Sequence, residues 1–134
     1  MIAIFCLDNN GGMTFNSRRQ SRDTVLCDRI LNNTSGAPLY MNEYSFKLFS
    51  DKPQKNIVCN GDFLSIAGQG DFCFVENTDI LPYADKIEKI IIYKWNRAYP
   101  ADRFFPLSLE SWRLVSRGEI GGSSHDITEE VYEK

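Results

Sequence analysis

Asp23 is the residue of this 134-residue chain whose type and position best suit chemistry. Val25, Leu26 and Ile30 recur after it with helical spacing, so it falls in the first turn of a helix expected from residue 22 to residue 33, with Ser21 as N-cap. A carboxylate there, beside apolar walls, can pair with a cationic or amidine-like heterocycle. An aspartate in a first helical turn is also favoured by the helix dipole alone.

Three arginines precede this aspartate in the segment Ser17-Arg18-Arg19-Gln20-Ser21-Arg22. Guanidinium groups near the N-terminus of a helix can bind an anion together with the free backbone N–H groups. The same composition is typical of a solvated basic loop. The sequence leaves both interpretations open.

Metal-dependent and triad chemistry have little support. His125 is the only histidine of the chain, whereas zinc hydrolases and metal-dependent ribonucleases need several histidines with acidic residues, so we expect no metal site and no zinc-dependent ribonuclease. Ser124, His125 and Asp126 are adjacent, and neighbouring side chains cannot form a catalytic triad. The four cysteines lack Cys-x-x-Cys spacing and lie among apolar residues, which predicts buried reduced thiols: Cys6, Cys27, Cys59 and Cys73.

Apolar runs predict the elements that hold these residues. Three of them, at residues 1–7, 72–75 and 87–93, indicate strands buried on both faces. About ten residues separate the last two, enough for a crossover through a short helix between parallel strands, which would place Glu76 and Asn77 near the ligand site. Further short strands are expected at 38–41 and 56–59, and short helices at 44–49 and 63–67, while residues 9–21 are expected to form an irregular loop.

The C-terminal region changes to an alternating pattern around Gly121-Gly122-Ser123-Ser124, which predicts an antiparallel hairpin. Together these elements predict one α/β domain over residues 1–134, with a mixed, mostly parallel twisted sheet flanked by helices. The net charge of −3 argues against nucleic-acid binding. No stretch has membrane-spanning length, and no signal sequence is evident, so we expect a cytoplasmic protein.

Six segments in register resemble dihydrofolate reductase over nearly the whole chain. They are the N-terminal strand, Asp8-x-x-x-Gly12-Met13, residues 40–46, residues 55–58, residues 86–92, and residues 101–106 followed by Trp112. The resemblance implies the fold of that family, with Asp23 at the position of the proton-relay carboxylate. This chain is shorter than the usual member, mainly between residues 60 and 71.

The same resemblance implies that the cofactor positions have changed. The glycine pair that lets the backbone approach the NADPH pyrophosphate falls on Glu76 and Asn77, and only glycine allows that approach. The arginine that would bind the NADPH 2′-phosphate falls on Glu43. Asn42, the residue before it, stands in place of a glycine, and Ser45 is a further position that the resemblance assigns to the cofactor. The arginine for the substrate's glutamate tail becomes Gln54, the loop tryptophan becomes Arg18, and the pterin-contacting threonine becomes Tyr93.

Three functions follow as hypotheses. The preferred one is a dihydrofolate reductase-like domain without NADPH-dependent reduction, with no cofactor expected, that binds a small ligand. The alternative is an active reductase of a small heterocycle that uses NADH or a flavin, with Glu43 on ribose hydroxyls. The third is an interaction protein, with a homodimer formed through an aromatic edge of Tyr93, Trp95, Tyr99 and Phe104.

One pocket would decide between these functions. The register predicts a cleft closed by Arg18 and lined by Ile4, Asp23, Cys27, Phe46, Phe74 and Tyr93. Tyr93 is larger than threonine, so its ring would fill part of the pterin space and its hydroxyl would bond Asp23.

Overall fold

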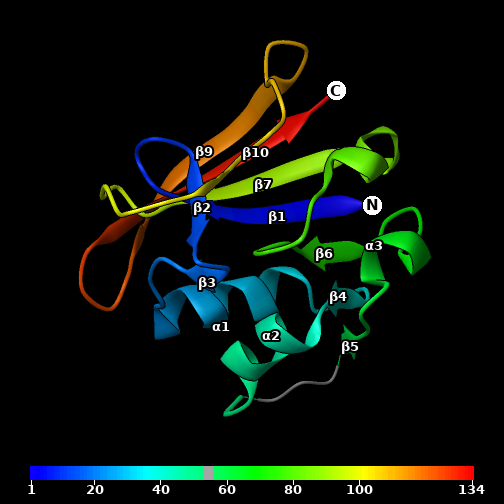
Figure 1. Ribbon diagram of the computed structural model, residues 1–134, viewed down its shortest axis with the longest axis horizontal. Helices are drawn as coiled ribbons and strands as arrows, with labels where there is room; N and C mark the ends of the chain where they lie inside the picture. The colour runs from blue at the N-terminus through cyan, green and yellow to red at the C-terminus, as the bar shows by residue number, and fades with distance from the viewer. Residues whose placement is uncertain (53–55) are drawn as a thin grey trace.

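The computed structural model of the protein describes residues 1–52 and 56–134. Its centre is a seven-stranded sheet in the order β5-β4-β6-β1-β7-β10-β9 (Figure 1). The strands are β1 (Ile2–Leu7), β4 (Leu39–Met41), β5 (Ile57–Cys59), β6 (Phe72–Phe74), β7 (Lys89–Lys94), β9 (Arg113–Gly121) and β10 (Asp126–Glu133).

The predicted mixed sheet is confirmed. Strand β1 is parallel to both β6 and β7 and lies between them, and β4 and β5 continue the parallel part. Strand β10 runs antiparallel to β7 and to β9, so the C-terminal hairpin adds two antiparallel strands to a parallel sheet. The central parallel strands β1, β6 and β7 are mostly apolar because neither of their faces is open to solvent.

Helices cover both faces of the sheet. They are α1 (Thr24–Asn33), α2 (Glu43–Phe46), η1 (Lys47–Phe49), α3 (Phe63–Ile66) and the 3-10 segment η2 (Leu81–Lys86). Segment η2 carries the crossover from β6 to β7, as the spacing of the two strands predicts. The helices expected near residues 44–49 and 63–67 are also confirmed.

Successive residues of β1 enter two separate cores. Ala3, Phe5 and Leu7 pack on one face with residues of α3 and η2 and with the segment after β8. Ile4 packs on the other face with α1 and with Tyr93 from β7. The side-chain period of two in a strand explains why one apolar run supplies both cores.

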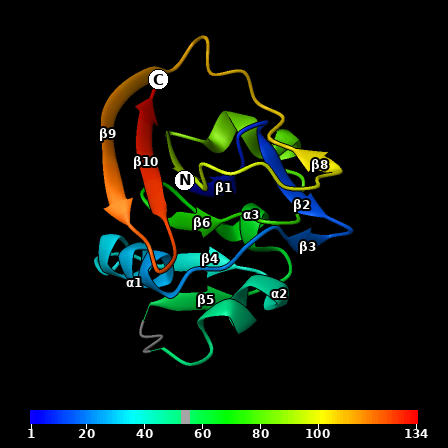
Figure 2. The same cartoon turned by 90° about the vertical axis from the view of Figure 1, so that its left-hand side faces the viewer.

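A second sheet of three strands projects beside the main sheet (Figure 2). Its strands are β2 (Gly12–Phe15), β3 (Arg18–Arg19) and β8 (Arg103–Phe104). The prediction of an irregular loop over residues 9–21 is therefore wrong. The β2–β3 turn consists of Asn16 and Ser17, both with positive φ (52° and 62°), which is the left-handed geometry of a two-residue hairpin turn without its usual glycine.

The cysteines differ in part from the sequence prediction. All four are free, and Cys27 and Cys73 are buried as expected. Cys59 is exposed, since it ends the outermost parallel strand β5, and Cys6 is only partly buried. No helix in the described ranges combines the length and apolar character needed to cross a membrane.

Candidate functional site

Asp23 is the N-cap of α1, one residue before the first helical turn in which the sequence placed it. Its extended backbone lets Oδ1 accept a hydrogen bond from the Leu26 N–H at 3.0 Å, so Asp23 and not Ser21 caps the helix. The carboxylate also accepts from the Ser123 N–H at 2.7 Å and from the Ser123 hydroxyl at 3.2 Å. The turn between β9 and β10 therefore lies against the start of α1.

The carboxylate is held in its charged form by these contacts. Burial raises the pKa of Asp23, but the hydrogen bonds from Leu26 and Ser123 outweigh it, so the pKa lies below the ordinary value. An anionic acceptor with three protein donors has little capacity left for a ligand.

Two neighbours fix the turn that carries Ser123. A Cβ atom on Gly122 would lie 2.6 Å from the His125 carbonyl oxygen and 2.8 Å from Asp23 Oδ2, so only glycine fits there. The His125 ring donates from Nε2 to the Trp95 carbonyl oxygen at 2.6 Å. His125 thus ties the turn to the end of β7.

The cavity beside Asp23 has a volume of about 10 Å³. A space of this size holds at most one water molecule. Of the predicted pocket residues, Asp23, Cys27 and Phe74 line it. Glu76, which the sequence placed near the ligand site, lines it too, together with the unpredicted Trp95. Burial raises the pKa of the Cys27 thiol to about 11, which keeps it protonated.

The other predicted pocket residues pack near this cavity without lining it. Ile4, Phe46 and Tyr93 belong to the core between the sheet and α1. The Tyr93 hydroxyl accepts from Asn33 Nδ2 at 3.2 Å and bonds Glu129, so the predicted hydrogen bond to Asp23 is wrong. The ring of Tyr93 lies under α1, and its hydroxyl reaches Asn33 at the C-terminal end of this helix. Asp23 lies at the opposite end, where it caps the N-terminus.

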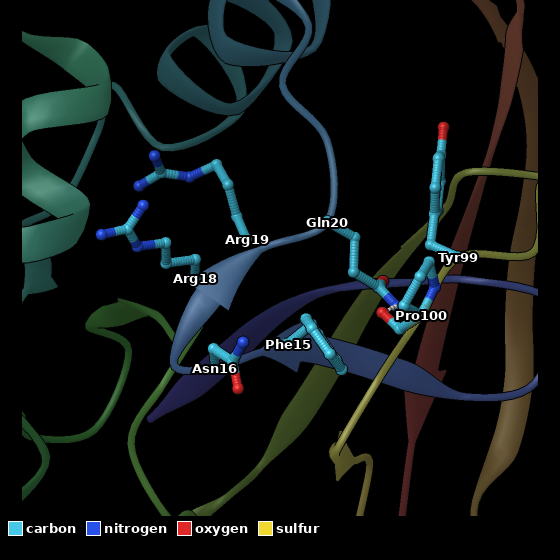
Figure 3. Close-up of a pocket in the computed structure, with 7 residues that line it drawn as sticks. All are labelled: Phe15, Asn16, Arg18, Arg19, Gln20, Tyr99 and Pro100. Atoms are coloured by element: carbon cyan, nitrogen blue, oxygen red, sulfur yellow. Dashed lines mark hydrogen bonds between the residues drawn. The ribbon is translucent and has the colours of Figure 1, made fainter.

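Arg18 lies at a different cavity, of about 490 Å³, between the β2–β3 hairpin and the loop after β7 (Figure 3). It does not line the cavity at Asp23, where Arg22 lies instead. The sequence placed the three arginines in one loop. In the structure Arg18 and Arg19 form strand β3, whereas Arg22 follows this strand and lines the cavity at Asp23.

Four of the positions that the resemblance assigns to the cofactor bond one another in two pairs, Ser45 with Glu76 and Asn42 with Asn77. Glu76, buried after the end of β6, accepts from Arg19 Nε and Nη2, both at 2.9 Å, and from the Ser45 hydroxyl at 2.7 Å. Arg19 also stacks on the Tyr44 ring, with its guanidinium carbon 4.4 Å from the ring centre. A bidentate arginine–carboxylate pair is among the strongest side-chain contacts in proteins.

A second part of this network joins the two segments. Asn42 caps α2 by accepting from the Ser45 N–H at 3.0 Å, and its Nδ2 donates to Asn77 Oδ1 at 2.8 Å. Glu43, by contrast, is exposed. Gln54, the position to which the resemblance assigns the substrate arginine, lies outside the described residues.

Asp8 is a site residue that sequence reasoning missed, and for Arg19 it missed the pairing with Glu76. Asp8 is buried and accepts from Gly12 N at 2.7 Å, Gln20 Nε2 at 3.1 Å and Tyr99 N at 3.1 Å. Burial raises its pKa, but these bonds outweigh that effect and lower it. The spacing from Asp8 to Tyr99 carries no local signal that the two would meet.

The aromatic edge proposed for dimer formation is not present as a surface. Tyr93 and Trp95 are only 1% and 4% exposed, because both are packed in the core under α1. Phe104 is 51% exposed on β8. Over residues 1–52 and 56–134, no group of three or more His, Cys, Asp or Glu side chains is arranged to hold a metal ion.

Comparison with solved structures decides the fold. The chain superposes on dihydrofolate reductase from Enterococcus faecalis, solved in complex with NADP(H) and RAB-propyl, with a TM-score of 0.68 and 13% sequence identity, over 98% of this chain and 94% of that one. The chain has the dihydrofolate reductase fold. No protein-family profile and no curated protein sequence matches it.

Glu76 and Asn77 stand where the resemblance places the glycine pair for the pyrophosphate, and both side chains bond other residues of the chain. The charge of Glu76 is paired with Arg19. A phosphate at this position would have to open that ion pair.

Proposed function

We propose that this protein does not reduce dihydrofolate with NADPH and that it acts as a small-ligand-binding domain on the dihydrofolate reductase fold. The observation that carries the proposal is the buried contact of Glu76 with Arg19 and Ser45. The closed cavity beside Asp23 supports it independently, since a pterin ring needs far more than the space of one water molecule.

The energy of this contact is large compared with ordinary cofactor binding. Separating a buried ion pair by removing or displacing one partner costs about 3–5 kcal/mol. A ligand with micromolar affinity has a total binding free energy of about −8 kcal/mol. The Arg19–Glu76 pair is partly buried, so a dinucleotide that opened it would lose at most roughly half of that energy.

Titration with NADPH, followed by its fluorescence, tests the proposal. We expect no saturable change with micromolar NADPH, and micromolar binding would refute the proposal. A diaminopyrimidine antifolate in a thermal-shift assay is the matching test for the Asp23 cavity, where stabilisation of the wild type would show that a heterocycle enters.

The reductase alternative rests on Glu43, which is exposed at the first residue of α2. A carboxylate there suits ribose hydroxyls, so NADH and flavin titrations belong in the same experiment. Tighter binding of NADH than NADPH, or a yellow purified protein, would favour this alternative.

An interaction role is supported by a different surface from the one that the sequence indicated. Strand β9 is a nine-residue edge strand with Leu114 and Val115 exposed, and such an edge can pair with a second copy of the chain. Light scattering after size exclusion measures this directly, and a salt-resistant dimer would support it.

A further inference from the structure

We propose that the chain forms a two-fold dimer in which β9 pairs antiparallel with β9 of a second copy, with Gly118 at the centre of the pair. The proposal rests on the interaction role of β9 and deepens it by naming the partner and the register. It is independent of the ligand-binding role. Three features of β9 carry it: its open edge, the direction of its free backbone groups, and its charges.

Strand β9 is open along its outer edge. It ends the seven-stranded sheet and is paired there only with β10. Figure 2 shows it as the outermost strand beside β10. All its residues from Arg113 to Glu119 are exposed. Proteins often protect an edge strand with lysine or proline, and β9 contains neither, so its edge is accessible to a further strand.

The backbone groups that face this edge belong to alternate residues. The Gly122 N–H donates to the His125 carbonyl oxygen at 3.1 Å, so these two residues form a hydrogen-bonded pair. Along an antiparallel ladder, such pairs alternate with pairs whose N–H and C=O groups point away from each other. Gly118, four residues before Gly122, therefore bonds β10. Its neighbours Arg117 and Glu119 direct their N–H and C=O groups to the open edge.

A bulge limits the length of the edge that can pair. Val115 is an extra residue in β9, since Leu114 and Ser116 on either side of it face adjacent residues of β10. A bulge interrupts the ladder and bends the strand, so the regular part of β9 runs from residue 116 to residue 121. One strand pair of this length is smaller than a standard interface of about 1,600 Å², so we expect a reversible dimer.

The charges of β9 select one register. In a two-fold antiparallel pair centred on Gly118, Arg117 of each copy lies opposite Glu119 of the other. Each of these two pairs would exchange backbone hydrogen bonds and place opposite charges side by side on one face. The neighbouring two-fold registers are centred on Arg117 or on Glu119, and they put two arginines or two glutamates directly opposite each other.

Both charged side chains are free to make these contacts. Arg117 is 61% exposed, and its Nε lies 3.6 Å from Glu130, a carboxylate that Lys94 also reaches at 3.3 Å. Glu119 accepts from the Thr128 hydroxyl at 3.0 Å, and among the described residues no lysine or arginine forms an ion pair with it. A second copy can therefore supply the cation that Glu119 lacks without breaking a strong contact.

Amide hydrogen exchange tests the register without any substitution. It is followed by NMR on the full chain at about 50 µM and at about 1 mM, a range over which a weak dimer forms. The amides of Arg117 and Glu119 should exchange about tenfold or more slowly at the higher concentration, because the second copy supplies their acceptors. The amides of Gly118 and Ile120 are the controls, since they bond β10 and should be protected at both concentrations.

Charge reversal tests the identity of the partner. Glu119→Arg puts two arginines opposite each other and Arg117→Glu two glutamates, so each variant alone should dimerise about tenfold or more weakly than wild type in analytical ultracentrifugation. An equal mixture of the two variants should restore association, because each chain then meets the opposite charge on its partner. Recovery in the mixture also shows that both variants are folded. The matched controls Asp62→Arg and Arg18→Glu are exposed reversals outside β9 and should dimerise as wild type does.

Three results would overturn the proposal: a monomer at millimolar concentration, a dimer in which the amides of Arg117 and Glu119 stay unprotected, or a mixture of the two variants that associates no better than either alone. A dimer that gives the second or third result would refute this register and leave an interaction role through another surface. NADPH binding is measured with a different ligand and a different signal. A failure here therefore leaves the proposal about NADPH standing, and the reverse also holds.

Discussion

Replacing Asp23 with asparagine tests whether its carboxylate is a structural acceptor. The wild-type group accepts from Leu26 N with one oxygen and from Ser123 N with the other. Asparagine has one oxygen and one amide NH₂ group at these places. Whichever way the amide turns, one backbone N–H faces another donor, so Asp23→Asn should be costly although asparagine is a good N-cap elsewhere.

The expected loss is about 1.5–3 kcal/mol, the contribution of a hydrogen bond to a charged group. With an unfolding entropy of about 2.1 cal/mol/K per residue, this corresponds to a fall in Tm of roughly 5–11 °C. Thermal unfolding followed by circular dichroism measures it. Asp62→Asn is the matched control, because Asp62 is the N-cap of α3, is exposed and makes no side-chain cap bond, so its change should stay within about 0.5 kcal/mol.

The pH dependence gives a second test of the same reasoning. The pKa of Asp23 is lowered in the folded protein, so its contribution to stability is complete above the unfolded pKa of about 3.9 and is lost as pH falls through the folded value. The difference in stability between wild type and Asp23→Asn should therefore be full at neutral pH and shrink in acid. An Asp23→Asn variant as stable as Asp62→Asn, or a difference that does not change down to acid pH, would refute the structural assignment.

Two further substitutions test the parts of the structure next to Asp23. Gly122→Ala should destabilise the protein by about 1–3 kcal/mol in denaturant unfolding, because its Cβ would meet the His125 carbonyl and Asp23 Oδ2. Gly121→Ala is the control, since Gly121 has open space around it, and its effect should stay within about 0.5 kcal/mol. Equal effects of the two substitutions would contradict the close approach at Gly122. Tyr93→Thr should cost about 3–5 kcal/mol by leaving a cavity in the core under α1, whereas a loss below about 1 kcal/mol would show that the ring does not fill that core.

The amino-acid sequence alone predicts most of the sheet. Met1–Leu7 is apolar at every position, and so are residues 90–93, a pattern that is typical of strands buried on both faces. The turn at residues 121–124 likewise carries its own local signal, so the C-terminal hairpin was predictable. The β2–β3 hairpin was not, because Asn16 and Ser17 form its turn without glycine and the two strands are short.

The sequence also located positions whose residue types differ from those of dihydrofolate reductase, and the structure shows what replaced them. Glu76 and Ser45 are far apart in the chain, and Arg19 is farther still, so no local pattern indicates that they bond one another. Asp23 was recognised as a candidate carboxylate, but its partner Ser123 lies one hundred residues away. Periodicity and turn chemistry act over a few residues and determine the strands and helices, whereas the pairing of buried polar groups depends on which strand ends meet at one edge of the sheet, and only the tertiary structure decides that.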